Sequence, residues 1–304
     1  MRTASSKSPN VVDYPTCIVT AGGWARSGKG TSMAHLKGRI EQRGYGVRLI
    51  DQGLKFRAMG EVVLNAGQEL DSPTSLEAFI RLPETQRATL AVLGDLSSMT
   101  EEEIKARLRT PQISKVSAKV AKVPSAHEVT SGLLRTEVSE AVEAKSDVVI
   151  IDGRSMEGHA RRFENEGLAK FVLGWYFKCD TAIAARRSLG LFAAYEDLTH
   201  DEKLQLLAET LNISDRNRSD TLRDTDPLRE PARAYRLDLS TYGAPGTDVP
   251  YKMGFDMIHR GMAIVDTSYT SSIEEMTGPV SDMSMWALRF KGPLTQFDIG
   301  PQAI

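Results

Sequence analysis

The chain has 304 residues, of which 41% are hydrophobic and 26% are charged, as in an ordinary globular protein. Its 38 Lys and Arg side chains against 40 Asp and Glu leave a net charge of −2, so no global basic field favours nucleic-acid binding. No stretch approaches the ~20 apolar residues of a membrane span, and the polar N-terminus lacks the apolar core of a signal peptide. We therefore expect a cytoplasmic protein that binds neither nucleic acid nor membranes, with Cys17 and Cys179 as buried thiols.

Five short β-rich runs alternate with helical patterns, which predicts an α/β fold with a five-stranded parallel sheet flanked by helices. The expected strands are Thr16–Thr20, Val47–Asp51, Val148–Asp152, Phe171–Phe177 and Ala263–Asp266. Ligands of such sheets bind beyond the carboxyl ends of the strands, so the residues that follow these runs are the first candidates for a site.

Helix starts are indicated by capping-box patterns, in which Ser or Thr is followed three residues later by Glu. These patterns begin at Thr74, Thr100, Ser125, Thr199 and Ser271. Residues 60–105 are expected to be mostly helical. Residues 229–261, rich in Gly, Pro and Thr, are interpreted as an insertion or extended loop, and the tail after Gly278 as irregular.

The stretch GGWARSGKG, residues 22–30, fits the phosphate-binding pattern G-x-x-x-x-G-K. It lies between a predicted strand and a predicted amphipathic helix, and this arrangement forms a cradle of backbone N–H groups for phosphate. Gly30 stands where Ser or Thr usually follows the lysine, but Thr31 can still reach phosphate or Mg²⁺. The residues expected to bind ATP are Gly23, Ser27, Gly28, Lys29, Gly30 and Thr31, with Lys29 neutralising the β- and γ-phosphates.

The GKGT sequence of residues 28–31 resembles the loop of nucleoside monophosphate kinases, and further segments resemble the cytidylate kinase family in particular. These segments are IDQGLKFRAM, LRTPQISKVSAKVAKVPSAHE, IIDGRSMEG, ISDRNRSDTLRDTDPL and AIVDTSYTSSIEEM. The resemblance covers about residues 16–228 and 262–277. It implies the P-loop nucleoside monophosphate kinase fold, with NMP-binding and lid subdomains and with ATP and Mg²⁺ as cofactors.

The resemblance also suggests how the chain is divided. The expected parts are a polar N-terminal extension (1–15), a P-loop core with the second strand (16–59), an NMP-binding helical region (60–135), further core (136–190), lid helices (191–228), an insertion (229–261), and a final strand, helix and irregular tail (262–304).

Phosphoryl transfer needs positive charge around the migrating group, and the resemblance assigns residues to this role. It implies catalytic roles for Lys29, Arg154, Arg216 and Arg223, an acceptor-phosphate contact for Arg57, an acceptor-ribose contact for Asp220, and a magnesium site at Thr31 and Asp152. Arg216 and Arg223 are seven residues apart, which predicts one face of a lid helix. Each arginine by itself is alternatively a solvated or ion-paired surface residue, and Asp152 is alternatively a helix cap.

The departures from the family pattern lie at the acceptor base, where the family's serine, arginine and aspartate are replaced by Ala118, His127 and Ser155. Each lost partner leaves a buried polar group unpaired at ~1–3 kcal/mol, so we do not expect cytosine to be read by the family's contacts. Lys119 and Lys55 are possible substitutes, as is the neighbouring Ser117. The acceptor-binding residues are predicted to be Asp51, Arg57, Ser117, His127, Arg154, Ser155 and Asp220.

Other positions leave alternatives open. His127 is also interpreted as a surface residue, and Lys55 as either solvated or in contact with an acidic group of the acceptor. Arg26 either points to solvent or lies near the donor phosphates. Trp24, where the family has proline, is expected against the donor nucleotide, and Trp175 in the core.

The predicted function is transfer of the γ-phosphoryl group of ATP to a (d)CMP-like 5′-monophosphate. The alternatives are a kinase for a modified pyrimidine nucleotide or another phosphorylated metabolite, and a nucleotide-binding regulator without turnover. The sequence does not indicate an oligomeric state.

Overall fold

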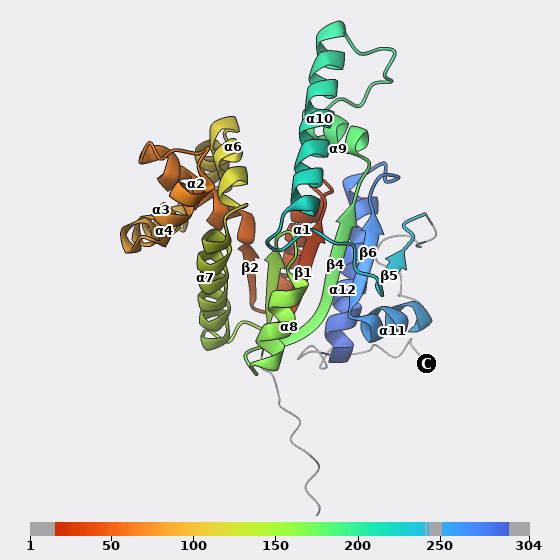
Figure 1. The fold of residues 1–304 in the computed structure, drawn as a ribbon. Coiled ribbons are helices and arrows are strands. Elements are labelled where there is room, and N and C mark those ends of the chain that lie inside the picture. The colour runs from red at the N-terminus through yellow and green to blue at the C-terminus, as the bar shows by residue number, and fades with distance from the viewer. Residues whose placement is uncertain (1–15, 241, 243–250, 292–304) are drawn as a thin grey trace, which may run out of the picture.

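The structure is a computed structural model that describes residues 16–240, 242 and 251–291. A sheet of six parallel strands in the order β2-β3-β1-β4-β6-β5 forms its centre (Figure 1). The strands are β1 (Cys17–Gly23), β2 (Val47–Asp51), β3 (Val148–Asp152), β4 (Lys170–Lys178), β5 (Tyr235–Leu237) and β6 (Met262–Asp266). The α/β class and the five expected strands are confirmed, but the predicted number of five is wrong because β5 pairs with β6 at the edge.

The helices were expected in most of the places where they occur. They are α1 (Lys29–Glu41), α2 (Gln52–Asn65), α3 (Pro73–Arg81), α4 (Pro83–Leu96), α5 (Glu101–Leu108), α6 (Pro111–Val120), α7 (Pro124–Glu143), α8 (Glu157–Asn165), α9 (Thr181–Leu189), α10 (His200–Leu222), α11 (Tyr251–Arg260) and α12 (Ile273–Lys291). The mostly helical segment 60–105 is confirmed.

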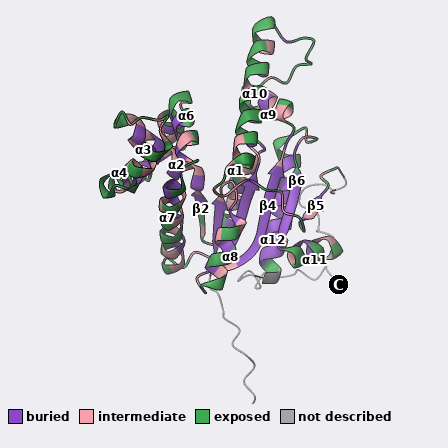
Figure 2. Cartoon of the chain, viewed as in Figure 1, coloured by how far each residue is buried: buried purple, intermediate pink, exposed green. Residues whose placement is uncertain are grey.

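Apolar side chains of the strands pack against helices on both faces of the sheet. The central strands are accordingly buried along most of their length (Figure 2). One face is covered by α1 and α12, through Met33, Leu36 and Val280 among others. The other face is covered by α7 and α8, through Leu134 and Phe163. All described residues of β1 are buried, as expected for the central strand of a sheet covered on both sides.

Two helical regions stand apart from these layers. Helices α2, α3 and α6 with the start of α7 enclose their own apolar core, which contains Met59, Leu76 and Ile80. Helices α9 and α10 pack together, and α10, with 23 residues, extends well beyond the carboxyl edge of the sheet (Figure 1). The site therefore lies between two helical regions and the ends of the strands.

Two of the five predicted capping boxes are confirmed, at Thr100 of α5 and Thr199 of α10. The others are wrong in position. Ser72 caps α3 with Pro73 behind it, α7 begins at Pro124 so that Ser125 is already helical, and Ser272 rather than Ser271 accepts from the backbone N–H of Glu275. In each of these cases a neighbouring residue offers the same type of cap or the proline fixes the start.

The segment 229–261 is not an irregular insertion throughout, because it contains β5 and α11. The tail after Gly278 is likewise helical as far as Lys291, since α12 continues through Pro279 and buries Val280 and Met283 against the sheet. The predicted extension 1–15 and the end of the predicted tail, 292–304, lie outside the described residues. The division of the chain into functional parts stays a prediction.

Cys17 and Cys179 are buried and free, as the sequence predicts. No helix in the described part of the chain is long and apolar enough to cross a membrane.

Candidate active site

The glycine loop leads from β1 directly into α1, as the phosphate-binding pattern predicts. Gly23 and Gly28 both adopt positive φ, 112° and 86°, which turns the backbone sharply at each end of the loop. Gly28 precedes α1, so the unpaired N–H groups of the first helical turn lie at the loop. Lys29 bends back over the loop and donates from Nζ to the carbonyl oxygens of Trp24 (2.5 Å) and Gly23 (3.3 Å).

Replacement of Gly23 by alanine is expected to lower the free energy of unfolding by about 2–3 kcal/mol. The added Cβ would lie 2.2 Å from the carbonyl oxygen of Phe177, at a φ that side chains rarely adopt. Gly38 of α1 is the matched control, because a Cβ there meets nothing within 4 Å and alanine favours the helix. Urea unfolding of both variants checks this, and equal stabilities would contradict the described loop geometry.

Arg154 follows β3 and connects the loop to α10. Its Nη1 donates to the carbonyl oxygen of Gly23 at 2.8 Å, and its Nε lies 3.0 Å from Oδ2 of Asp220 on α10. The other Asp220 oxygen lies 3.6 Å from Nη1 of Arg223. Asp220 thus holds two arginines from separate parts of the chain beside the phosphate loop.

Arg216 and Arg223 do not share a helical face as predicted. Helix α10 ends at Leu222, and Arg223 has extended backbone angles. Arg223 Nε donates to the carbonyl oxygen of Asp226 at 2.6 Å, and this contact holds the guanidinium against the turn that follows the helix. The turn is tight, because Asp226 has a φ of 50°. The two arginines approach the site from the helix and from its end.

The electrostatics show that these cations are crowded. Burial and the nearby Arg154 lower the pKa of Lys29 to about 7, and burial and Arg216 lower the pKa of Arg154 to about 10. Burial also lowers the pKa of Arg57 and Arg216. Crowded, partly desolvated cations are relieved by a bound polyanion, which is what a site for several phosphate groups requires.

The residues predicted to bind the acceptor phosphate lie at the start of α2. Asp51 ends β2 and accepts from the backbone N–H of Gly53 at 2.7 Å, which caps α2. Arg57, one turn further on, has a buried Nε without a hydrogen-bond partner among the described residues. Asp51 raises the pKa of Arg57, whereas the nearby Arg216 and Arg109 lower it. A free donor beside other cations at a strand end is well placed for a phosphate oxygen.

Asp152 and Thr31, the predicted magnesium ligands, offer oxygen atoms of the kind that Mg²⁺ binds. Asp152 ends β3 in register with Asp51 and Ala21, and its Oδ2 lies 3.6 Å from the position that a Cβ on Gly30 would take. Burial raises the pKa of Asp152 to about 6, against the lowering influence of Lys29. Thr31 is exposed in the first turn of α1. The described residues contain no group of three or more His, Cys, Asp or Glu side chains around a common point. Mg²⁺ commonly takes one or two protein oxygens plus phosphate oxygens and water, so this donor set fits.

The residues predicted to bind the acceptor base make separate local contacts and do not surround a common point. Ser117 Oγ donates to the carbonyl oxygen of Ser114 at 3.1 Å, on a part of α6 packed against Gly60. His127 Nε2 lies 2.8 Å from the carbonyl oxygen of Ala121, and its ring packs edge-on against Phe56 with centroids 5.2 Å apart. A carbonyl can only accept, so Nε2 carries the proton, and burial lowers the pKa of His127.

Lys55 and Lys119 form ion pairs with carboxylates of this chain. Lys55 Nζ lies 2.6 Å from Oε2 of Glu137, and its side chain is only 2% exposed, so the interpretation of Lys55 as solvated is wrong. Lys119 pairs with Asp71.

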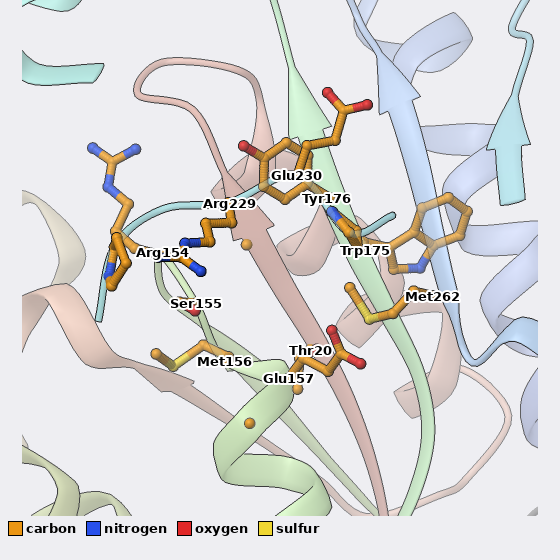
Figure 3. Close-up of a pocket in the computed structure, with 14 residues that line it drawn as sticks. Thr20, Arg154, Ser155, Met156, Glu157, Trp175, Tyr176, Arg229, Glu230 and Met262 are labelled. Atoms are coloured by element: carbon orange, nitrogen blue, oxygen red, sulfur yellow. The ribbon is translucent and has the colours of Figure 1, made fainter. Parts of the chain in front are cut away.

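A pocket of about 380 Å³ adjoins the candidate phosphate site (Figure 3). It lies over β1 and β4, between the start of α8 and residues 227–231, and Arg154 and Ser155 both line it. Lys29 and Arg57 do not line it, so the pocket is a neighbour of the phosphate site and not its centre. Of the three positions where the family's base contacts are replaced, only Ser155 opens onto it.

Arg26 and Trp24 contact other parts of the protein. Arg26 Nε lies 3.7 Å from Oε1 of Glu209 on α10, and the Trp24 ring lies 5.5 Å from Nζ of Lys178.

Sequence reasoning missed three charged or titratable residues near the site. Arg109 influences the pKa of both Arg57 and Asp152. Asp226 and His159 lie within electrostatic range of each other and of His127. Arg109 lies in the LRTP segment that carries part of the resemblance, so a signal for it was present. Asp226 lies directly before Pro227, and this Asp-Pro pair indicates a turn but not the contact of Asp226 with Arg223.

Comparison with known proteins agrees with this arrangement. A family model described as cytidylate kinase matches residues 19–245, which include the glycine loop, Arg154 and α10. The chain belongs to the cytidylate kinase family. It is therefore a phosphotransferase of the nucleoside monophosphate kinase type.

The relatives in this family are distant. The cytidylate kinase of Acinetobacter baylyi is 30% identical over 233 residues, which cover 73% of this chain and 89% of that protein. The cytidylate kinase of Shewanella loihica is 26% identical over 227 residues, 74% of this chain and 88% of that protein. The cytidylate kinase of Caulobacter vibrioides is 30% identical over 139 residues, which cover 46% of this chain and 54% of that protein.

Proposed function

We propose that this cytidylate kinase family member transfers the γ-phosphoryl group of ATP to a cytidylate-like 5′-monophosphate, with CMP or dCMP as the preferred acceptor. The observation that carries the proposal is the cluster formed by Lys29, Arg154 and Arg216 around the glycine loop, with Asp220 holding Arg154 in place. Phosphoryl transfer depends on positioning and on charge around the migrating group, and a cluster of this kind supplies both.

The donor would be held by the loop and by the first turn of α1. Backbone N–H groups of residues 28–31 would face the β- and γ-phosphates, and Lys29 would exchange its carbonyl contacts for phosphate oxygens. Thr31 and Asp152 would hold Mg²⁺, which supplies charge neutralisation between the β- and γ-phosphates when it is bound.

The acceptor would enter from the side of α2. Arg57 would bind its phosphate, and Arg154 and Arg223 would close over the transferred group from the opposite side. Asp220 would orient both of these arginines and reach the acceptor ribose. The carboxylate is already 3.0 Å from Arg154, so its first effect is to fix the arginine before substrate arrives.

The base would be read by fewer contacts than in the family pattern. Among the candidates from the sequence, Ser117, Lys55 and Lys119 contact other groups of the chain. Ser155 and the second ring nitrogen of His127 remain as polar groups for the base, and Ala118 offers none. We propose a preference for pyrimidines with reduced discrimination between cytosine and uracil.

Steady-state assays with Mg²⁺–ATP and a panel of CMP, dCMP, UMP, AMP, GMP and 5-substituted pyrimidine monophosphates test this proposal. The expected result is the highest kcat/KM for CMP or dCMP, with UMP lower by about 10–100-fold, which is the discrimination of one or two hydrogen bonds. A purine acceptor with the highest kcat/KM, or a modified pyrimidine far above CMP, would contradict it. ATP binding without transfer to any acceptor would favour a regulator.

A further inference from the structure

The glycine loop is fastened to α10 by a buried hydrogen bond. The backbone N–H of Ala25, in the middle of the loop, donates to Oδ1 of Asn217 at 2.7 Å. Asn217 is 8% exposed and lies 192 residues further along the chain. This hydrogen bond joins the glycine loop to α10, so it fixes the position of the helix relative to the loop.

Apolar packing strengthens this connection. The Ala25 side chain is 3% exposed and belongs to the apolar cluster between α9 and α10, which also contains Leu206 and Ile213 of α10. Arg26, the next residue, has a φ of 55° and lies within 3.7 Å of Glu209. The root of α10 and residues 24–26 of the loop therefore form one packed unit.

A closed ring of contacts results. The carbonyl of Gly23 in the loop accepts from Arg154, and Arg154 pairs with Asp220 of α10. Asn217 lies less than one helical turn before Asp220 and accepts from the loop N–H of Ala25. Arg216 is the neighbour of Asn217 in sequence. Any shift of α10 along its axis would thus move Arg216 and Asp220 relative to the phosphate loop, and the Asn217–Ala25 bond opposes that shift.

Asparagine at this position carries a cost. Its Nδ2 is buried and has no hydrogen-bond partner in the described part of the chain, which is unfavourable because the donor has lost its water. An apolar residue would avoid this cost but would leave the N–H of Ala25 unpaired. The amide is therefore explained by the acceptor that it offers to the loop.

We propose that Asn217 is a positioning residue, which sets the register of the α10 charges Arg216 and Asp220 on the phosphate loop. The inference rests on the proposed function, because the charges that it positions are those that would surround the transferred phosphoryl group. Asn217 itself touches neither substrate nor reacting atoms in this account. Its effect is on the alignment of donor and arginines, so kcat should respond more than the KM of the acceptor.

The test compares Asn217→Ala with Asn217→Asp and with Asn212→Ala. Asp keeps an oxygen for the N–H of Ala25 and removes the unpaired donor, while Asn212 is exposed on the same helix and serves as the matched control. We expect Asn217→Ala to lower kcat by about 10–100-fold with an acceptor KM within about twofold of the wild type. Asn217→Asp should stay within about threefold of the wild-type kcat, and Asn212→Ala should be indistinguishable from it.

Thermal unfolding of each variant separates positioning from stability. A lowered Tm for Asn217→Ala with an unchanged kcat at a temperature where the variant is folded would overturn the proposal. So would an Asn217→Asp variant that is folded and as slow as Asn217→Ala. If the wild type transfers no phosphoryl group, the proposed function fails, and calorimetric titration with Mg²⁺–ATP then decides on Asn217. Weaker binding by Asn217→Ala than by Asn217→Asp would support the positioning role, and equal binding would overturn it.

Discussion

Replacement of Lys29 by methionine is expected to lower kcat for phosphoryl transfer by about 10³-fold. The ammonium group lies over the glycine loop, within 2.5 Å and 3.3 Å of two loop carbonyls, and is the only side-chain cation that α1 places in its first turn. Methionine has a similar length and packs in the same space, but it offers no charge to the β- and γ-phosphates. The measurement is the initial rate of ADP formation at saturating acceptor.

Lys37→Met in the same helix is the control for this prediction. Lys37 lies on the outer face of α1 and pairs with Glu41 at 2.6 Å, so its loss should leave kcat within about twofold of the wild type. A Lys29→Met enzyme that is folded and retains more than a tenth of the wild-type kcat would mean that the donor phosphates do not lie on this loop.

Replacement of Glu137 by glutamine is expected to lower the free energy of unfolding by about 3–5 kcal/mol. Glu137 is the partner of Lys55 at 2.6 Å, and the Lys55 side chain is 2% exposed at the start of α2. Glutamine keeps the shape of the side chain but leaves a buried ammonium without a counter-charge. Urea unfolding followed by far-UV circular dichroism measures the change.

Two further variants show whether burial is the cause of this loss. The double variant Lys55→Met with Glu137→Leu removes both charges and should recover most of the lost stability. Arg135 lies on α7, as Glu137 does, and forms an exposed pair with Glu166 at the end of α8. Arg135→Ala breaks this pair and should change stability by no more than about 0.5 kcal/mol. If Glu137→Gln cost as little as Arg135→Ala, the Lys55–Glu137 pair would have to be solvated.

The central part of the site could be predicted because its signal is local. The glycine spacing between residues 23 and 29, a preceding strand and a following helix fix the loop within a dozen residues, and the structure has each of these parts. The strand ends that carry Asp51 and Asp152 follow from the same rule for parallel sheets.

What the sequence missed depends on contacts between distant segments. The three residues of β5 form a strand only because they pair with β6, and the proline in α12 is tolerated because the helix buries Val280 against the sheet. Lysine at position 55 looks solvated until its partner, 82 positions away, is known. Helix α10 ends at Leu222, which separates Arg216 from Arg223. Pro227 explains this end in part, because in a continued helix its ring would clash with the carbonyl of Arg223.

The pairing of Arg154 with Asp220 is a further example. Both residues lie in segments that resemble the family, but no pattern in the sequence shows that they meet at 3.0 Å beside Gly23. The same holds for Asn217, which lies next to Arg216 in the predicted lid and, in the structure, accepts from the backbone N–H of Ala25 in the loop.

Phosphorus-31 NMR of the protein mixed with Mg²⁺–ATP and CMP tests the central claim most directly, because it distinguishes transfer from hydrolysis in one spectrum. The account predicts that the γ-phosphate signal of ATP declines while β-phosphate signals of ADP and CDP grow in equal amounts, and that Lys29→Met abolishes both. Growth of ADP and inorganic phosphate without CDP, or an unchanged spectrum over the same period with dCMP as well, would contradict it.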